Sequence, residues 1–202
     1  MENGETVVPM TLDPESSVFV VFRKTAPANA MMLKKVAPTT VATLEKPWRV
    51  AFQAARGAPA TITLPKLRSL SEQADPGVRY FSGIASYATS FTLPKGIKPG
   101  APLWLDLGEV GEIAEVTVNG RSAGYAWHKP YRVNLSGVVR RGSNRLEVKV
   151  ANLWVNRLIG DAQPDATKVT WTAIPTYRAD APLRPSGLIG PVTLEAARPS
   201  NP

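Results

Sequence analysis

The 202-residue sequence predicts an all-β fold, a sandwich of two antiparallel sheets. Short runs alternate apolar and polar residues with a period of two, the pattern of half-buried strands. Turn residues, among them 15 Gly and 19 Pro, separate these runs, often at the spacing of about 8–12 residues that sandwiches show. No window of 12 or more residues carries an apolar stripe of helical period.

Four runs show the strand pattern most clearly. Residues 103–107 place three leucines on one face, and residues 146–150 place apolar groups on one face and charges on the other. Residues 115–118 lead into Asn119-Gly120, a pair that tolerates positive φ and predicts a hairpin into residues 122–127. Further strands are expected over residues 18–22, 48–52, 60–64, 86–93, 131–135, 169–172 and 192–196.

The chain divides into three parts by composition. Residues 45–198 hold the predicted sandwich. Residues 25–44 contain Pro27, Pro38 and many Ala and Thr, which is typical of a linker. Residues 1–24 include the apolar strand 18–22, which either completes the edge of the sandwich or is the last strand of a preceding domain.

Composition excludes several chemistries. Without Cys there is no disulfide, thiolate nucleophile or Cys-ligated metal, and one His, His128, excludes a His-rich metal site. The net charge of +8 is spread out, without the basic patch and stacking aromatics that nucleic-acid binders show. It indicates either a solvated basic surface or attraction to an acidic polymer such as a uronic-acid polysaccharide. The first residues, MENGETVVPM, are no signal peptide, and no apolar stretch is long enough to span a membrane.

A series of motifs follows in a specific order. It reads YFSGIASY (80–87), LDLG (105–108), AEVTVNG (114–120), GYAWHKPY (124–131), GSNRLEV (142–148), NLWVNRLIGD (152–161) and SGLIGPV (186–192). This series resembles the galactose-binding-like jelly-roll domain of glycoside hydrolases, called the family 2 sugar-binding type. Its last two motifs most resemble the C-terminal region of α-L-rhamnosidases of glycoside hydrolase family 106.

The resemblance implies a galactose-binding-like jelly roll with an extra N-terminal strand and linker. It implies a non-catalytic accessory or carbohydrate-binding module with no cofactor, in a periplasmic or secreted enzyme whose targeting signal is not in this chain. Its partners would be a rhamnose-containing or acidic pectic polysaccharide and the catalytic domain of the hydrolase, with no nucleic acid or membrane partner. Two alternatives stay open: a purely structural domain, and a small glycan-active enzyme that uses the region from Asp106 to Glu112 with His128.

The aromatic residues are the candidate carbohydrate contacts. Sugars present C–H faces that stack on aromatic rings, and polar neighbours bind their hydroxyls. One candidate group surrounds the predicted hairpin and consists of Tyr125, Trp127, His128 and Tyr131. A second consists of Trp171, Tyr177 and Arg184, in or beside the irregular stretch 161–185, which is long for a compact sandwich. The alternative is packing, since Tyr125 and Trp127 alternate and therefore share one face, which would also suit the core.

The NLWVNRLIGD motif holds the candidate structural or interdomain residues. These are Asn152, Trp154, Asn156, Arg157 and Asp161. A buried Arg–Asp pair needs mutual hydrogen bonds to offset its desolvation, so Arg157 and Asp161 either brace the long loop or face a catalytic domain. We expect Trp48 and Trp104, like Trp154, in the core or at a domain interface. The sequence shows no catalytic motif, and its acids lack the spacing of a calcium loop.

Overall fold

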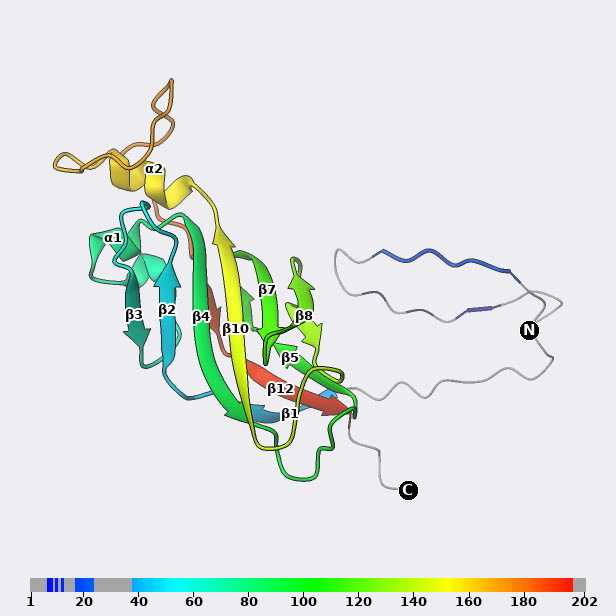
Figure 1. Ribbon diagram of the computed structural model, residues 1–202. Helices are drawn as coiled ribbons and strands as arrows, with labels where there is room; N and C mark the ends of the chain where they lie inside the picture. The colour runs from blue at the N-terminus through cyan, green and yellow to red at the C-terminus, as the bar shows by residue number, and fades with distance from the viewer. Residues whose placement is uncertain (1–6, 9, 11, 13–16, 24–37, 198–202) are drawn as a thin grey trace.

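The computed structural model describes residues 7–8, 10, 12, 17–23 and 38–197, and it has the predicted all-β sandwich architecture (Figure 1). Its strands are β1 (Pro38–Thr43), β2 (Trp48–Phe52), β3 (Thr61–Leu64), β4 (Gly83–Thr92), β5 (Leu103–Asp106), β6 (Glu109–Val110), β7 (Glu112–Val118), β8 (Arg121–Ala126), β9 (Arg132–Asn134), β10 (Ser143–Asn152), β11 (Leu188–Gly190) and β12 (Thr193–Ala197). Three short helices complete it: η1 (Leu70–Glu72), α1 (Pro76–Arg79) and α2 (Val155–Asp161).

Two antiparallel sheets form the layers of the sandwich. The larger has six strands in the order β3-β2-β4-β10-β7-β8, and the smaller has the order β1-β12-β5-β9. β11 and β6 form a separate two-stranded sheet. Because neighbouring strands are mostly far apart in sequence, the folded sheets bring distant segments side by side.

The core lies between the two sheets and follows from the alternation. Leu146, Val148 and Val150 of β10 are fully buried. Leu103 and Leu105 of β5, in the smaller sheet, are also fully buried and belong to the same core cluster. Burying each such side chain contributes about 1.5–3 kcal/mol. The core therefore provides a rigid frame for the loops at its ends.

The hairpin predicted at Asn119-Gly120 is confirmed. Both residues have positive φ, 53° and 79°, and β7 pairs with β8 around them. The Asn119 amide also donates to the Val138 carbonyl at 3.1 Å and to Asn144 Oδ1 at 2.8 Å. The turn is thus tied to a neighbouring loop as well as to its own strands.

The structure corrects the linker prediction. Residues 38–43 lie in the predicted linker 25–44 but form β1, which pairs with β12 at the edge of the smaller sheet. Their β-branched side chains, Thr39, Thr40, Val41 and Thr43, suit a strand. The remaining residues of the predicted linker that precede residue 38 lie outside the described residues.

Two predicted strands are absent from this sandwich. Residues 18–22 form no strand among the described residues, and Phe19 is 93% exposed, so they do not complete the edge of the sandwich; that they end a preceding domain stays a prediction. Residues 169–172 also form none, because the Val169 and Thr170 amides donate to the Asp161 carboxylate instead of to a neighbouring strand. Within the described part of the chain, no helix is long and apolar enough to cross a membrane.

Candidate functional site

The candidate site lies at the end of the sandwich where β10 leads into α2. Figure 1 shows α2 lying across this end of the six-stranded sheet, with the loop that follows it projecting beyond. Asn152 closes β10 and is 8% exposed. Its amide donates to the Gly83 carbonyl at 3.1 Å, and its Oδ1 accepts from the Gly187 amide at 2.6 Å. This one side chain joins the end of β10 to the start of β4 and to the residue before β11.

Asn156, on α2, holds the far end of the loop. Its amide nitrogen donates to the Arg184 carbonyl and its Oδ1 accepts from the Arg184 backbone amide, both at 2.8 Å. Arg184 is therefore fixed through its backbone, while its side chain, a predicted carbohydrate contact, is exposed. The loop between α2 and β11 is thus closed by a buried amide.

Arg157 and Asp161 hold the near end of the same loop. Both are buried, at 6% and 7% exposure, and Arg157 Nε lies 3.0 Å from Asp161 Oδ1. Asp161 accepts from Thr170 Oγ1 at 2.5 Å and from the amides of Thr170 and Val169 at 2.8 and 3.1 Å. Burial acts to raise the pKa of Asp161, but these hydrogen bonds and the Arg157 charge outweigh it and lower the pKa below its usual value. The carboxylate is therefore ionised at neutral pH.

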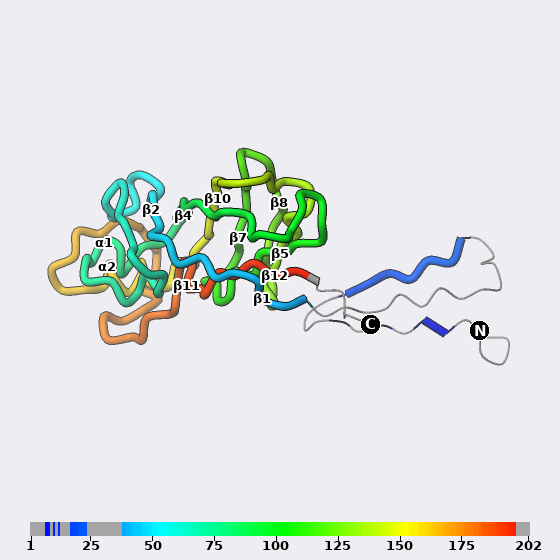
Figure 2. Tube along the Cα trace, turned by 90° about the horizontal axis from the view of Figure 1, so that it is seen from below, coloured from blue at the N-terminus to red at the C-terminus, as the bar shows by residue number. Residues whose placement is uncertain are grey.

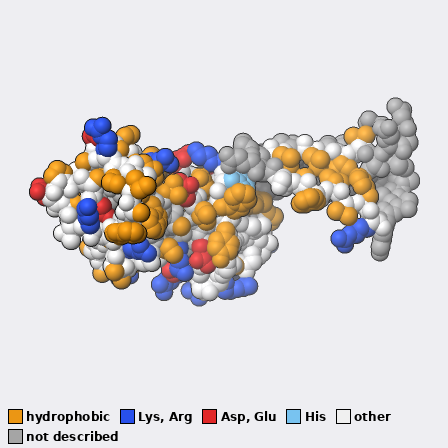
Figure 3. Space-filling model, turned by 90° about the horizontal axis from the view of Figure 1, so that it is seen from above, with side chains coloured by type: hydrophobic (Ala, Val, Ile, Leu, Met, Phe, Trp, Pro, Cys, Tyr) orange, Lys and Arg blue, Asp and Glu red, His pale blue; other side chains and the backbone are white. Residues whose placement is uncertain are grey.

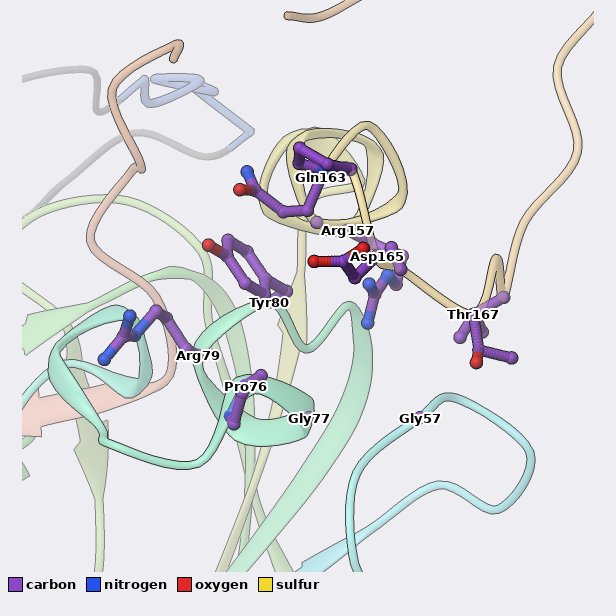
Figure 4. A pocket seen from close by; sticks show the side chains of 13 residues that line it. Gly57, Pro76, Gly77, Arg79, Tyr80, Arg157, Gln163, Asp165 and Thr167 are labelled. Carbon is purple, nitrogen blue, oxygen red and sulfur yellow. The ribbon is translucent and has the colours of Figure 1, made fainter. Parts of the chain in front are cut away.

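A cavity of about 520 Å³ opens beside α2. Figure 4 shows its walls: Tyr80 and Arg79 from the end of α1, Arg157 and Gln163 from α2 and the turn after it, and Gly57 from the β2–β3 loop. The Arg157 guanidinium lies over the Tyr80 ring, 5.8 Å from its centroid. Sequence reasoning singled out Arg157 but missed Arg79 and Tyr80; Tyr80 opens the YFSGIASY motif, and Arg79 precedes it.

A second, smaller hollow of about 250 Å³ contains the loop aromatics. Trp171 and Tyr177 line it together with Thr170, Thr172 and Thr176. Trp171 is 84% exposed, so its ring is free to meet a ligand. The structure brings these two predicted carbohydrate contacts together.

The other predicted aromatic group lies on the edge strand β8 and just after it. Tyr125 and Trp127 are each 63% exposed, so the alternative that places them in the core is wrong. Trp127 makes an edge contact with His128, with ring centroids 4.7 Å apart, and Tyr131 packs against the core. Figures 1 and 2 both place β8 far from α2, so the two aromatic groups do not form one site.

Sequence reasoning missed a row of apolar side chains on the outer face of the six-stranded sheet. Ala151 of β10 pairs with Ile84 of β4 on one side and with Ile113 of β7 on the other. Trp127 follows Ala126, the last residue of β8, which pairs with Ala114, the residue after Ile113. We call Ile84, Ala151, Ile113 and Trp127 the apolar row.

The apolar row is exposed and has further apolar neighbours in sequence. Ile84 and Ile113 are 45% and 49% exposed. Leu153 and Trp154, which follow β10, are also exposed, so Trp154 is not a core residue. Two residues further along β10 and β7 the same face is polar, because Lys149 Nζ lies 3.5 Å from the Glu115 carboxylate.

Two acids of the region considered for catalysis form ion pairs. Asp106 Oδ2 lies 2.8 Å from Arg132 Nε, and Glu109 lies 2.8 Å from Lys129 Nζ. Among the described residues, no group of three or more His, Cys, Asp and Glu side chains could hold a metal ion.

The comparisons with known proteins agree with this architecture. The model of the family described as glycosyl hydrolase 2 galactose-binding domain-like matches residues 79–181. The chain is similar to a rhamnosidase from Novosphingobium sp. PP1Y, with 58% identity and a TM-score of 0.82 over 86% of this chain and 16% of that chain. It is also 35% identical over 191 residues to a putative beta-glucuronidase of Formosa agariphila, covering 79% of this chain and 16% of that protein.

A more distant likeness concerns the fold alone. A Ruminococcus gnavus β-glucuronidase in complex with an N1-substituted uronic isofagomine is 20% identical, with a TM-score of 0.55 over 82% of this chain and 31% of that one. This chain spans about a sixth of the length of the rhamnosidase and of the Formosa protein. Since the family model covers half of the chain, the chain belongs to the glycosyl hydrolase 2 galactose-binding domain-like family.

Proposed function

We propose that this chain is the non-catalytic accessory domain of a larger glycoside hydrolase of the α-L-rhamnosidase type. In this proposal it packs against the rest of that enzyme through the apolar row. The similarity to the Novosphingobium rhamnosidase, of which the chain covers 16%, supports the parent enzyme. The same proposal includes export of the enzyme to the periplasm or the cell exterior, where it would contact polysaccharides.

The apolar row is the observation that carries the docking role. An exposed row that crosses neighbouring strands of a sheet face is unlike the scattered apolar residues of an ordinary surface, and contiguous apolar patches mark interaction sites. Ile84, Ile113 and Trp127 each keep about half or more of their surface in contact with solvent. Figure 3 shows hydrophobic side chains spread over the face seen from above, with Lys and Arg scattered among them.

Docking is tested by mixing this chain with the remainder of its native polypeptide, produced as a second chain, and measuring the dissociation constant by calorimetry. Ile113→Glu puts a charge into the apolar row, and we expect binding to weaken at least tenfold because the charge must be desolvated. Thr117→Glu is the control. Thr117 lies on the same face of β7 as Ile113, but two residues past Glu115 and outside the apolar row, so we expect the dissociation constant to change less than twofold.

Two results would refute the docking role. One is equal binding by the wild type and the Ile113→Glu variant while both remain folded. The other is an intact mass of the native polypeptide that equals this chain alone, because no remainder would then exist for it to join. A purely structural domain would show the same docking, but no glycan binding.

Contact with glycan through the loop aromatics is the second candidate function. The exposed Trp171 ring beside Tyr177 and three threonines favours it, because a stacking plane with nearby hydroxyls suits a sugar. Affinity electrophoresis on rhamnose-containing and acidic pectic polysaccharides tests it. Trp171→Ala should abolish retardation, and Ile174→Ala, which removes another exposed side chain of the same loop, should leave it unchanged. Equal retardation of both variants would refute the role.

A further inference from the structure

The Arg157 guanidinium is buried but makes no hydrogen bond within the described part of the molecule. Its Nε is sealed from solvent and has no hydrogen-bond partner, although it lies within ion-pair distance of Asp161. The two Nη atoms have no acceptor among the described residues either, and they are not among the sealed atoms. The guanidinium is thus 94% buried, yet its two Nη groups, which are not sealed from solvent, have no acceptor in the described protein and are open to an acceptor from outside the chain.

The two Nη atoms of Arg157, which lines the 520 Å³ cavity, lie close to two glycines, Gly57 and Gly160. A Cβ added at Gly57 would lie 3.2 Å from Nη1, and one added at Gly160 would lie 2.5 Å from Nη2. The two glycines thus let the backbone approach the guanidinium closely. In Figure 4 the guanidinium extends from α2 into the space between Tyr80 and Thr167, above Gly57.

The other cavity walls suit a sugar ring. A volume of about 520 Å³ is within the range of small-molecule sites, roughly 300–1,000 Å³. Tyr80 supplies an aromatic ring and Gln163 an amide. Arg79 also lines the cavity, but its guanidinium points away from Arg157 in Figure 4, and its Nε donates to the Gln73 carbonyl at 2.9 Å.

We infer that this cavity binds a uronic acid residue of a glycan, with the carboxylate on Arg157 and the ring beside Tyr80. A planar guanidinium presents paired N–H groups whose geometry matches a carboxylate. Arg157 and Arg79 line the cavity together with one acid, Asp165, and the chain carries a net charge of +8, which draws an anionic glycan toward it. The site is separate from the apolar row, so its test does not depend on docking.

Calorimetric titration of the full chain with D-galacturonate, D-galactose and acetate tests this inference. We expect galacturonate to bind at least tenfold more tightly than either of the others, because only galacturonate has both the carboxylate and the ring. Arg157→Gln should weaken galacturonate about tenfold to a hundredfold, the range of a lost charge-assisted contact. Thermal unfolding of this variant checks that the fold is kept.

A second variant keeps the test valid if Arg157→Gln does not fold. Thr167 is exposed at the cavity rim, so Thr167→Trp should block entry without touching the core and abolish galacturonate binding. Thr172→Trp makes the same change at an exposed position of the same loop that lines the other hollow, and we expect no effect. Galactose binding as tight as galacturonate would overturn the role of the carboxylate. Acetate binding as tight would overturn the sugar, and galacturonate binding unaffected by Thr167→Trp would overturn the site.

Discussion

Replacement of Asp161 by Asn tests how the α2 end of the sandwich is held. The wild-type carboxylate accepts hydrogen bonds from Thr170 Oγ1 and from the amides of Thr170 and Val169, and it lies 3.0 Å from Arg157 Nε. The Asn side chain keeps the shape but carries no charge, and its amide group turns one acceptor into a donor. One loop donor then loses its partner and the buried Arg157 loses its counter-charge.

The size of the effect follows from these two losses. An unsatisfied buried donor costs about 1–3 kcal/mol, and breaking a buried ion pair costs about 3–5 kcal/mol. Because the Asn oxygen still accepts from part of the loop, we expect the free energy of unfolding to fall by about 3 kcal/mol. For a domain of this size that lowers the melting temperature by about 6–12 °C.

The pH dependence gives an independent check. The pKa of Asp161 is lowered on folding, so its stabilisation is present above the unfolded pKa of about 3.9. It is lost as the pH falls through the lower folded value. Urea unfolding followed by tryptophan fluorescence should therefore show a constant difference between wild type and variant from about pH 8 to pH 5, which shrinks below about pH 4.

The control is Asp180→Asn, in the same loop. Asp180 pairs with Arg178 on the surface, with 72% and 86% of the side chains exposed, and exposed pairs contribute little. We expect a change within about 0.5 kcal/mol. A loss below 1 kcal/mol for Asp161→Asn, or a difference that persists unchanged at pH 3, would refute the reasoning that this carboxylate anchors the loop.

Three further substitutions test the packing around the site. Gly187 has a φ of 82°, and a Cβ there would overlap the buried Tyr87 hydroxyl, so Gly187→Ala should cost about 3 kcal/mol or more in urea unfolding; a smaller loss would show that the turn can shift. Asn156→Ala removes both hydrogen bonds to the Arg184 backbone, and should cost about 2–3 kcal/mol and speed proteolysis of the loop, whereas an unchanged cleavage rate would contradict this role. Trp48 is 1% exposed, so Trp48→Ala should cost about 3–5 kcal/mol in the same assay, and a marginal change would count against its place in the core.

Local sequence patterns predicted the elements that depend on neighbouring residues. The alternation in residues 146–150 and the Asn119-Gly120 turn both appear in the structure, because side-chain period and positive φ are local properties. Whether a β-prone segment finds a partner strand is a property of the whole fold. Residues 18–22 and 38–43 both suit strands, yet within the described part of the chain only the second segment pairs, with β12.

The site depends still more on distant residues. Residues 169–172 have strand propensity, but their amides are taken by Asp161, several residues earlier in the chain. Each buried backbone N–H must find an acceptor, but that acceptor can be a backbone carbonyl, a side chain or water. The local sequence does not show which of these it will be. The cavity likewise assembles α1, α2 and the β2–β3 loop, which only the tertiary fold brings together.

The apolar row shows how a break in the alternation acquires meaning from the register. Ile113 follows Glu112 and precedes the buried Ala114, so it stands at an outward position where the pattern expects a polar residue. In one strand such a residue is unremarkable, because much of any protein surface is apolar. Pairing of β10 with both β4 and β7 aligns Ile113 with Ala151 and Ile84, and three independent strands then break the alternation at the same level. Contiguous exposed apolar side chains mark interaction surfaces, which is why we propose this row as the docking surface.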